Sequence, residues 1–282
     1  MDSKTKIYLW NLIPDRLAYW YVRIRQTSFA NSSMKIRVKA VKPKMYGLLD
    51  CNSGLQLYIS RIKRYYKYKE GLDIRVRELS DKYFFDLVSF RDCDLFCDVG
   101  ANIGEVTKIA QTLNAQMQFI TVEPDPIEIS ALQMNLDGIR NYAVFLDSDV
   151  QTKEVKWSNQ SGDTRLKFPG ENRKRTGITN LNLHNLKMSS ETITSTLDTL
   201  LLDYPFKEGF LKLEAEGFEP EVLMGAKRVL RRFRYISIDV GEERLLEGNL
   251  VSSFQDCYDF LSKHDFTFLY KRFNSCLFRR SI

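Results

Sequence analysis

The sequence predicts an α/β fold with a mostly parallel sheet of seven strands, and three observations support this. Short apolar runs and helical patterns alternate from residue 94 to the C-terminal end. The apolar run Leu95–Val99 is stopped by Gly100, as a buried parallel strand would be. In Glu105–Leu113 the apolar residues recur with the spacing of one helix face. Such alternation predicts a parallel sheet covered by helices on both faces.

The remaining elements follow the same pattern in order. Strands are expected at 95–99, 117–122, 142–146, 210–213 and 235–240, and an antiparallel hairpin of 266–270 and 276–278 closes the sheet. Helices are expected at 105–113, 126–136, 197–202, 219–232 and 254–263. Ligands of such sheets bind beyond the carboxyl ends of the strands, where the strand order reverses. The residues that follow each strand are therefore the candidates for a functional site.

Charge divides the chain into two regions. Residues 1–90 contain 18 basic and 8 acidic side chains, a net charge of +10, whereas residues 91–282 contain 24 and 28, a net charge of −4. We interpret 1–70 as a small basic and aromatic N-terminal region and 71–282 as the main domain. The polar stretch 150–190 within that domain is expected to be an insertion or a lid.

Composition and cysteine usage predict a soluble cytoplasmic protein. A chain of 282 residues with 44% hydrophobic residues can bury a core without disulfides. No stretch approaches the about 20 apolar residues that a membrane span needs, and no signal-peptide pattern is present. The five cysteines are scattered without a CxxC pair and indicate free thiols in a reducing compartment: Cys51, Cys93, Cys97, Cys257 and Cys276.

A glycine-containing loop, Asp98-Val-Gly-Ala-Asn-Ile-Gly104, follows the first predicted strand, and Asp98 is expected to point into the cleft. Glu123 ends the second strand, 25 positions later, where a carboxylate can bind a ribose diol. The loop lacks the G-x-G-x-x-G spacing of dinucleotide folds and has no Lys or Arg, while Asp98 and Glu105 would repel a phosphate. These charges favour S-adenosylmethionine, a cationic nucleoside, over NAD. The alternative is that the glycines only shape a turn.

A second cluster of ionisable residues, Lys212 to Glu221, lies at the end of the fourth predicted strand. Alternation places Lys212 and Glu214 on one face of that strand, and Glu216 follows it. Carboxylates at this edge are expected acid/base groups, although a purely structural role is the alternative. Glu219 and Glu221 open the next helix, where they suit its N-terminal dipole.

Together these motifs resemble the FkbM family of S-adenosylmethionine-dependent methyltransferases. The resemblance runs from about residue 71 to 239 and rests on Asp98 to Gly104, Val122-Glu-Pro-Asp125, Ser195-Thr-Leu-Asp198, Leu211-Lys-Leu-Glu-Ala-Glu-Gly217 and Glu221-Val-Leu-Met-Gly-Ala226. It implies a Rossmann-like class I methyltransferase fold and O-methylation of a hydroxyl on a sugar, glycan or related metabolite. It also implies a set of cofactor-binding residues: Asp98, Gly100, Ala101, Asn102 and Gly104 at the methionine end, and Glu123 with Pro124 at the ribose.

The chain departs from the family pattern in three places. The family usually has Asp-Val-Glu-Gly where this chain has Glu214-Ala-Glu-Gly217, so the first carboxylate reaches one methylene further. The stretch 141–157 looks shortened, and the adenine contacts expected there are Asp147 or Ser148. Residues 1–60 have no counterpart in the family.

A hydroxyl acceptor benefits from a general base, and a carboxylate is expected because the chain has only two histidines. Glu214 is the first choice, Glu216 the second and Asp239 the third. Lys212 either orients a carboxylate or acceptor oxygen, or forms a plain salt bridge. We expect no metal ion, because no His and carboxylate set has ligand spacing.

Three other functions remain open at this point: a nucleic-acid methyltransferase, a cofactor-binding module without catalysis, and a dehydrogenase. Lys, Arg and Tyr interleave in 61–69 and could bind nucleic acid, which would make the protein a nucleic-acid methyltransferase. We favour packing of a small subdomain for these aromatic residues. The other possibility is a cofactor-binding module without catalysis. The expected partner is a small-molecule or glycan acceptor.

Overall fold

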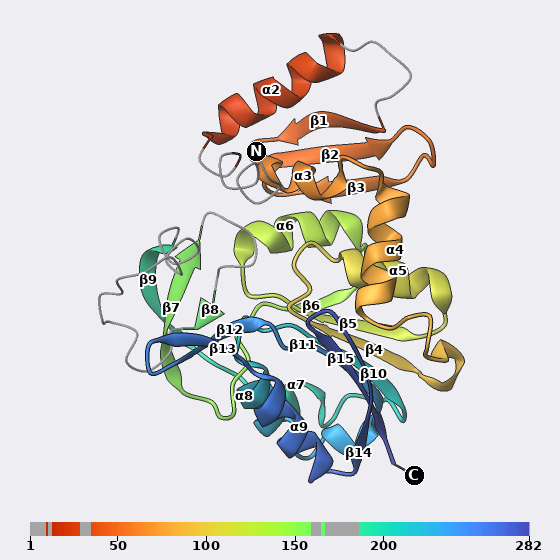
Figure 1. Cartoon of the computed structure of the whole chain (residues 1–282), viewed down its shortest axis with the longest axis vertical. Helices are drawn as coiled ribbons and strands as arrows, with labels where there is room; N and C mark the ends of the chain where they lie inside the picture. The colour runs from red at the N-terminus through yellow and green to blue at the C-terminus, as the bar shows by residue number, and fades with distance from the viewer. Residues whose placement is uncertain (1–9, 11–12, 29–34, 159–164, 167–185, 282) are drawn as a thin grey trace.

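Seven strands form the central sheet of the computed structural model, which describes residues 10, 13–28, 35–158, 165–166 and 186–281 (Figure 1). The sheet order is β14-β15-β11-β10-β4-β5-β6. Five strands run parallel: β4 (Leu95–Val99), β5 (Gln118–Val122), β6 (Arg140–Tyr142), β10 (Gly209–Leu213) and β11 (Phe233–Asp239). β14 (Phe266–Arg272) and β15 (Ser275–Arg280) form an antiparallel hairpin beside β11. The predicted Rossmann-like fold is confirmed.

The strand order reverses between β4 and β10. From β4 the chain moves outward through β5 to β6, then returns to β10 on the other side of β4. Val99 at the end of β4 pairs with Val122 of β5 and with Leu213 of β10, so three carboxyl ends meet at one edge. This is the position at which ligands bind in sheets of this type.

Successive residues of each strand belong to two different hydrophobic cores, as the pleat requires. Phe96 of β4 and Phe210 of β10 pack with α4 (Leu72–Lys82) and α5 (Glu105–Leu113). Cys97 and Leu211 pack into the opposite core with three other helices: α7 (Leu197–Leu201), α8 (Glu219–Met224) and α9 (Phe254–Ser262). Helices therefore cover both faces of the sheet.

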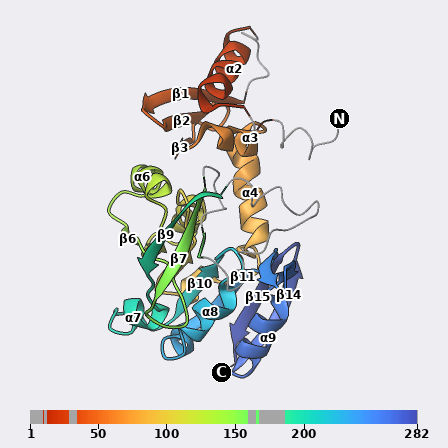
Figure 2. The ribbon, with the colours of Figure 1, turned by 90° about the vertical axis from the view of Figure 1, so that its left-hand side faces the viewer.

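The N-terminal region has a sheet of its own. It contains α2 (Asp15–Ser28), the antiparallel strands β1 (Ile36–Lys42), β2 (Met45–Asp50) and β3 (Gln56–Ile59), a 3-10 turn η1 (Ile62–Arg64) and α3 (Tyr65–Tyr68). Its core includes Val22, Ile36 and Met45, and it extends to Ala131 of α6 (Pro126–Asn135). Both views show the region stacked on α6, with α2 outermost (Figure 2). The predicted boundary at residue 70 stays a prediction.

Two predicted elements are shorter than expected. The third strand ends at Tyr142, and residues 144–146 run irregularly until Leu146 forms an isolated bridge with Ser195. The predicted helix 219–232 stops at Met224, followed by Gly225 and a 3-10 turn. The carboxylate of Asp198 accepts hydrogen bonds from the amides of Arg228 and Val229, which occupies groups that a continuous helix would use.

The stretch 150–190 is more regular than predicted where the structure describes it. β7 (Thr152–Ser158), β8 (Arg165–Leu166) and β9 (Leu186–Ile193) pair as an antiparallel sheet, while 159–164 and 167–185 lie outside the described residues. A further hairpin of β12 (Glu242–Leu246) and β13 (Asn249–Ser252) was not predicted from the sequence. None of the helices described is long and apolar enough to cross a membrane. All five cysteines are free.

Candidate active site

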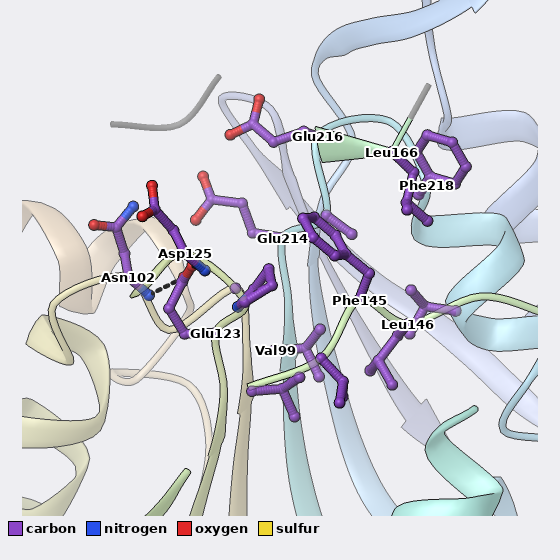
Figure 3. Close-up of a pocket in the computed structure, with 16 residues that line it drawn as sticks. Val99, Asn102, Glu123, Asp125, Phe145, Leu146, Leu166, Glu214, Glu216 and Phe218 are labelled. Carbon is purple, nitrogen blue, oxygen red and sulfur yellow. Dashed lines mark hydrogen bonds between the residues drawn. The ribbon is translucent and has the colours of Figure 1, made fainter. Parts of the chain in front are cut away.

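A pocket opens at the carboxyl ends of β4, β5 and β10 (Figure 3). Its wall combines loop residues with an apolar side: Val99, Gly100, Asn102, Val122, Glu123, Pro124, Asp125, Val144, Phe145, Leu146, Leu166, Glu214, Ala215, Glu216, Phe218 and Val222. Four of these are carboxylates, and among the residues that the structure describes none that lines the pocket is Lys, Arg or His. The pocket is therefore suited to a ligand with positive charge and without phosphate.

Gly100 allows the loop after β4 to touch the end of β10. Its φ is +71°, and a Cβ built on it would lie 2.0 Å from the carbonyl oxygen of Glu214. Its amide donates to the carbonyl of Val122 at 2.9 Å. Any side chain here would push the two strand ends apart. The predicted turn is thus also the place where the pocket walls meet.

Glu123 lines the pocket and is nearly buried. Its two carboxylate oxygens accept the amides of Asn102 at 2.7 Å and of Asp125 at 2.8 Å. Burial raises the pKa of Glu123 to about 7. Because a carboxylate oxygen has more than one lone pair, each can still accept a ligand hydroxyl. This arrangement is compatible with the predicted ribose contact.

Asp98 lies behind the pocket rather than in it, which corrects the expectation that its carboxylate points into the cleft. The side chain is fully buried, 3.1 Å from the Nζ of Lys212, and accepts the Thr107 hydroxyl at 2.7 Å. Ala101 and Gly104 also turn away from the pocket, because both contact Leu136, which follows α6. Of the predicted methionine-end residues, only Gly100 and Asn102 line the pocket.

Lys212 is a buried cation that joins the ends of β4 and β10. Its ammonium donates to the carbonyls of Val99 at 3.1 Å and Gly100 at 2.8 Å. It also forms ion pairs with Asp98 at 3.1 Å and Glu214 at 3.3 Å. Burial alone would lower the pKa of Lys212, but these two carboxylates raise it. Lys212 therefore forms salt bridges with two carboxylates, and its role in orienting a carboxylate or an acceptor oxygen stays a prediction.

Glu214 faces the pocket across from Asn102 and Asp125 (Figure 3). It accepts the Tyr83 hydroxyl at 2.7 Å and pairs with Lys82 at 3.2 Å, in addition to Lys212. Burial opposes ionisation, but the two lysines lower the pKa of Glu214 overall. A carboxylate stabilised as an anion in this way is a weak base. Tyr83 and Lys82 were not predicted, because they lie in a different element far away in sequence.

Two further carboxyl groups lie near Glu214 on the β11 side. Asp239 pairs with Lys82 at 2.6 Å, and burial together with the charge of Glu214 raises the pKa of Asp239. Burial and the charges of Glu214, Glu219 and Asp239 raise the pKa of Glu243 to about 8. Sequence reasoning named Asp239 but missed Glu243, although Glu243 stands only four positions later.

Glu216 lines the pocket with a φ of +51°, a left-handed conformation that a non-glycine residue seldom adopts. Its neighbour Gly217 packs against the backbone of Arg244. Glu219 is buried and accepts the amides of Ala215 at 2.9 Å and Gly217 at 3.1 Å. Glu219 therefore fixes the turn that presents Glu216 to the pocket.

The apolar side of the pocket follows β6. Val144, Phe145 and Leu146 line it, whereas Asp147 is fully buried and pairs with Lys153 at 2.5 Å. Asp147 also accepts the amide of Ser148 at 2.7 Å. The segment after the third strand does reach the pocket, but through apolar residues that sequence reasoning passed over.

Two buried arginines of the N-terminal region hold the pocket loops. Arg61 pairs with Asp125 at 2.8 Å and with Glu128. Arg64 donates to Asn102, a pocket residue, and pairs with Glu105 at 3.2 Å. Part of the basic run 61–69 thus faces acidic groups inside the protein instead of forming a continuous exposed track for nucleic acid.

Glu105 receives a second arginine from α4. Arg75 pairs with it at 3.2 Å, and although burial opposes ionisation, Arg75 and Arg64 lower the pKa of Glu105 to about 2. The carboxylate that was expected to repel phosphate from the loop is neutralised here. Two of the four carboxylates that line the pocket are likewise paired with cations: Asp125 with Arg61, and Glu214 with Lys82 and Lys212.

Comparison with known proteins identifies relatives of the chain. The family model "Methyltransferase FkbM domain" matches residues 98–268, more than half of the chain. A methyltransferase FkbM from Methylobacillus flagellatus KT has 16% identity and a TM-score of 0.45, with 71% of this chain and 47% of that chain covered. This chain therefore spans about half the length of that protein. No curated protein matches the chain.

Two other solved structures are similar at comparable levels. The precorrin-6y C5,15-methyltransferase from Geobacter metallireducens GS-15 has 13% identity and a TM-score of 0.37, with 75% of this chain and 90% of that chain covered. An O-methyltransferase family protein from Burkholderia thailandensis has 9% identity and a TM-score of 0.42, with 74% and 56% covered. The assignment below rests on the family model and not on these structures.

Proposed function

The chain belongs to the FkbM methyltransferase family, and we propose that it methylates a hydroxyl group on a sugar, glycan or related metabolite. S-adenosylmethionine is its cofactor and supplies an electrophilic methyl group. The observation that supports the proposal best is the lining of the pocket, whose described residues include four carboxylates and no Lys, Arg or His. A cationic nucleoside fits that lining, whereas a phosphate-bearing cofactor does not.

The pocket suggests which residues hold the cofactor. We assign Glu123 to the ribose hydroxyls, with Pro124 and Asp125 beside it, and Gly100 and Asn102 to the methionine end. The apolar wall around Phe145 suits the adenine ring. Asp98, Ala101, Gly104 and Asp147 act from behind as positioning residues, because they are buried away from the pocket lining or packed against α6 or Lys153.

The base is assigned from the charges around the acceptor side. Attack by a hydroxyl benefits from proton removal, and a carboxylate with a raised pKa is the stronger base. We propose Asp239 for this role, because it shares Lys82 with the pocket residue Glu214 and its pKa is raised. Its neighbour Glu243 is the alternative, and Glu214 orients Lys82 and Tyr83. Glu216 lines the pocket opposite the cofactor loops and would contact the acceptor. The free cysteines support a cytoplasmic location.

Transfer of a labelled methyl group to a panel of sugars, glycans and small hydroxylated metabolites tests the proposal, with RNA and protein as comparison acceptors. We expect label in an ether linkage, which survives alkali. Asp239→Asn should lose turnover and keep cofactor binding, whereas the exposed Asp203→Asn serves as the matched control. Label found on a nitrogen, an alkali-labile ester or RNA would contradict O-methylation of such a metabolite.

A further inference from the structure

The outward face of α2 is apolar, which is unusual for a surface helix. Leu17, Trp20, Tyr21 and Ile24 recur at i, i+3, i+4 and i+7 and are 59%, 62%, 49% and 57% exposed. This spacing places all four side chains on one helix face. In both views α2 is the outermost element of the N-terminal region (Figures 1 and 2). A contiguous exposed apolar face of this kind marks an interaction surface.

The opposite face of α2 packs into the core of the N-terminal region. Ala18 and Val22 are buried in the core of the N-terminal region, and helical geometry places them across the helix from the exposed stripe. The exposed residues are therefore not required to attach the helix. Their apolar character needs another explanation.

Basic side chains border the apolar stripe. Arg16 lies on one side of it, beside a shallow cavity that Lys42 and Lys44 of the β1–β2 turn also line, together with the aromatic rings of Tyr19, Trp20 and Tyr46. Among the residues that the structure describes, these three cations form no ion pair. The one acidic residue of α2, Asp15, pairs with Lys63 at 3.8 Å.

We infer that this face, the outer side of α2 with the β1–β2 turn, binds the surface of an anionic lipid bilayer. Exposed Trp and Tyr suit the interfacial zone of a bilayer, and Leu17 and Ile24 suit its acyl boundary. The unpaired cations face lipid phosphates, for which a positive surface is complementary. This inference does not depend on the proposed function, because the face is separate from the pocket residues.

Charge and chemistry distinguish the bilayer from other partners. A second copy of the chain docked on the same face would bring two sets of the cations Arg16, Lys42 and Lys44 into one interface, where like charges repel. A nucleic acid would use the cations and aromatic rings but has no use for exposed aliphatic Leu17 and Ile24. A bilayer with anionic headgroups uses both the aliphatic stripe and its basic border.

Co-sedimentation of the full chain with vesicles tests the inference. We expect binding to phosphatidylcholine vesicles that contain phosphatidylglycerol, weaker binding as salt rises, and little binding to phosphatidylcholine alone. The variant Leu17→Ser/Trp20→Ser/Ile24→Ser should lower the partition coefficient at least about tenfold. The control Leu113→Ser/Ile193→Ser/Tyr270→Ser removes exposed apolar residues elsewhere and should leave it unchanged.

A charge series makes the test specific to this face. Arg16→Ser/Lys42→Ser/Lys44→Ser should lower binding by about fivefold per cation, whereas Lys207→Ser/Lys227→Ser/Lys263→Ser, with the same change of net charge, should not. Calorimetric binding of S-adenosylmethionine checks that each variant is folded.

Four results would overturn the inference. They are equal losses in the two charge series, no binding to anionic vesicles, oligonucleotide binding that needs the cations and not the apolar stripe, or light scattering that shows a dimer dissociated by the apolar variant.

Discussion

The carboxylates on the two sides of the pocket have different kinds of partners. On the cofactor side, formed by the loops after β4 and β5, Glu123 accepts two backbone amides and Asp125 pairs with a buried arginine. On the acceptor side, at the ends of β10 and β11, Glu214 and Asp239 share the cation Lys82, and Glu214 also pairs with Lys212. Glu243 lies in the field of the same carboxylates.

The cofactor side is thus a binding surface whose carboxylates already have partners, whereas the acceptor side has an excess of acidic charge. Backbone amides and arginines fix the cofactor loops in one geometry before any ligand arrives, which lowers the entropy cost of binding. Mutual repulsion on the acceptor side keeps Asp239 and Glu243 ready to hold a proton, which is the property that a base needs. Lys212 touches both sides, because it contacts Gly100 and Glu214.

Loss of Lys212 should have the largest effect, since it breaks the link between the two sides. Lys212→Met leaves the buried Asp98 without its cation and Glu214 with Lys82 alone, and should lower the free energy of unfolding by about 3–5 kcal/mol. Urea denaturation measures this. Adding Asp98→Asn should recover part of the loss, and no recovery would mean that Lys212 acts through its backbone contacts alone.

Gly100→Ala tests the contact between the loop and β10. The new Cβ would lie 2.0 Å from the carbonyl oxygen of Glu214, so the strand ends must separate. Gly138→Ala is the matched control, because Gly138 has a φ of +70° but nothing within 4 Å of its Cβ position. We expect Gly100→Ala to be less stable than the control by at least about 2 kcal/mol, and to lose cofactor binding. Equal stability of the two variants would show that the loop is free to move.

The residues at this edge of the sheet show which features of the site can be predicted from the sequence. Asp98, Gly100 and Glu123 follow strands whose pattern is local, so their place at one sheet edge could be predicted. The partners could not, because Tyr83 and Glu214 are 131 positions apart and Arg61 and Asp125 are 64 apart. The direction of the Asp98 side chain could not be predicted either, because its ion pair with the buried Lys212 determines that direction.

The strand pattern had similar limits in the fold. Apolar runs predicted six of the seven strands of the main sheet, whereas β6 (Arg140–Tyr142) shares only Tyr142 with the strand expected at 142–146. The polar strands β7 and β9 have no such run. The helix after β10 was predicted too long, because the capping carboxylate of Asp198 comes from another element. Local periodicity gives element types, whereas long-range polar contacts set their ends.

Arg64→Gln should weaken the cofactor side without touching the acceptor side. It removes the hydrogen bond to Asn102 and one of the two arginines on Glu105, so the loop loses its fixed position. We expect the Kd for S-adenosylmethionine to rise about tenfold, measured by calorimetry. Arg75→Gln removes the other arginine of Glu105, but Arg75 pairs with Glu78 and Glu105 rather than with the pocket residue Asn102, so this variant should change Kd less. An equal rise in both variants would assign the effect to Glu105 and not to the loop.

The smallest expected effect is a pH dependence that separates the two sides. The pKa of Glu123 is about 7 in the folded protein, so its carboxylate becomes ionised as pH rises through 7. Ribose hydroxyls donate to the ionised form, and affinity should therefore rise between pH 6 and 8 by up to about tenfold and level off above. Methylthioadenosine is the probe, because it has the ribose but no amino group that titrates in this range.

Two variants assign that pH dependence to one side of the pocket. Glu123→Gln should remove the change in affinity, since the amide does not ionise. Glu243→Gln should leave the binding profile in place and alter only the pH profile of turnover, because the pKa of about 8 belongs to the acceptor side. If Glu243→Gln abolished the binding profile, the two sides would titrate as one unit. The contrast between a fixed cofactor surface and an unbalanced acceptor surface would then be wrong.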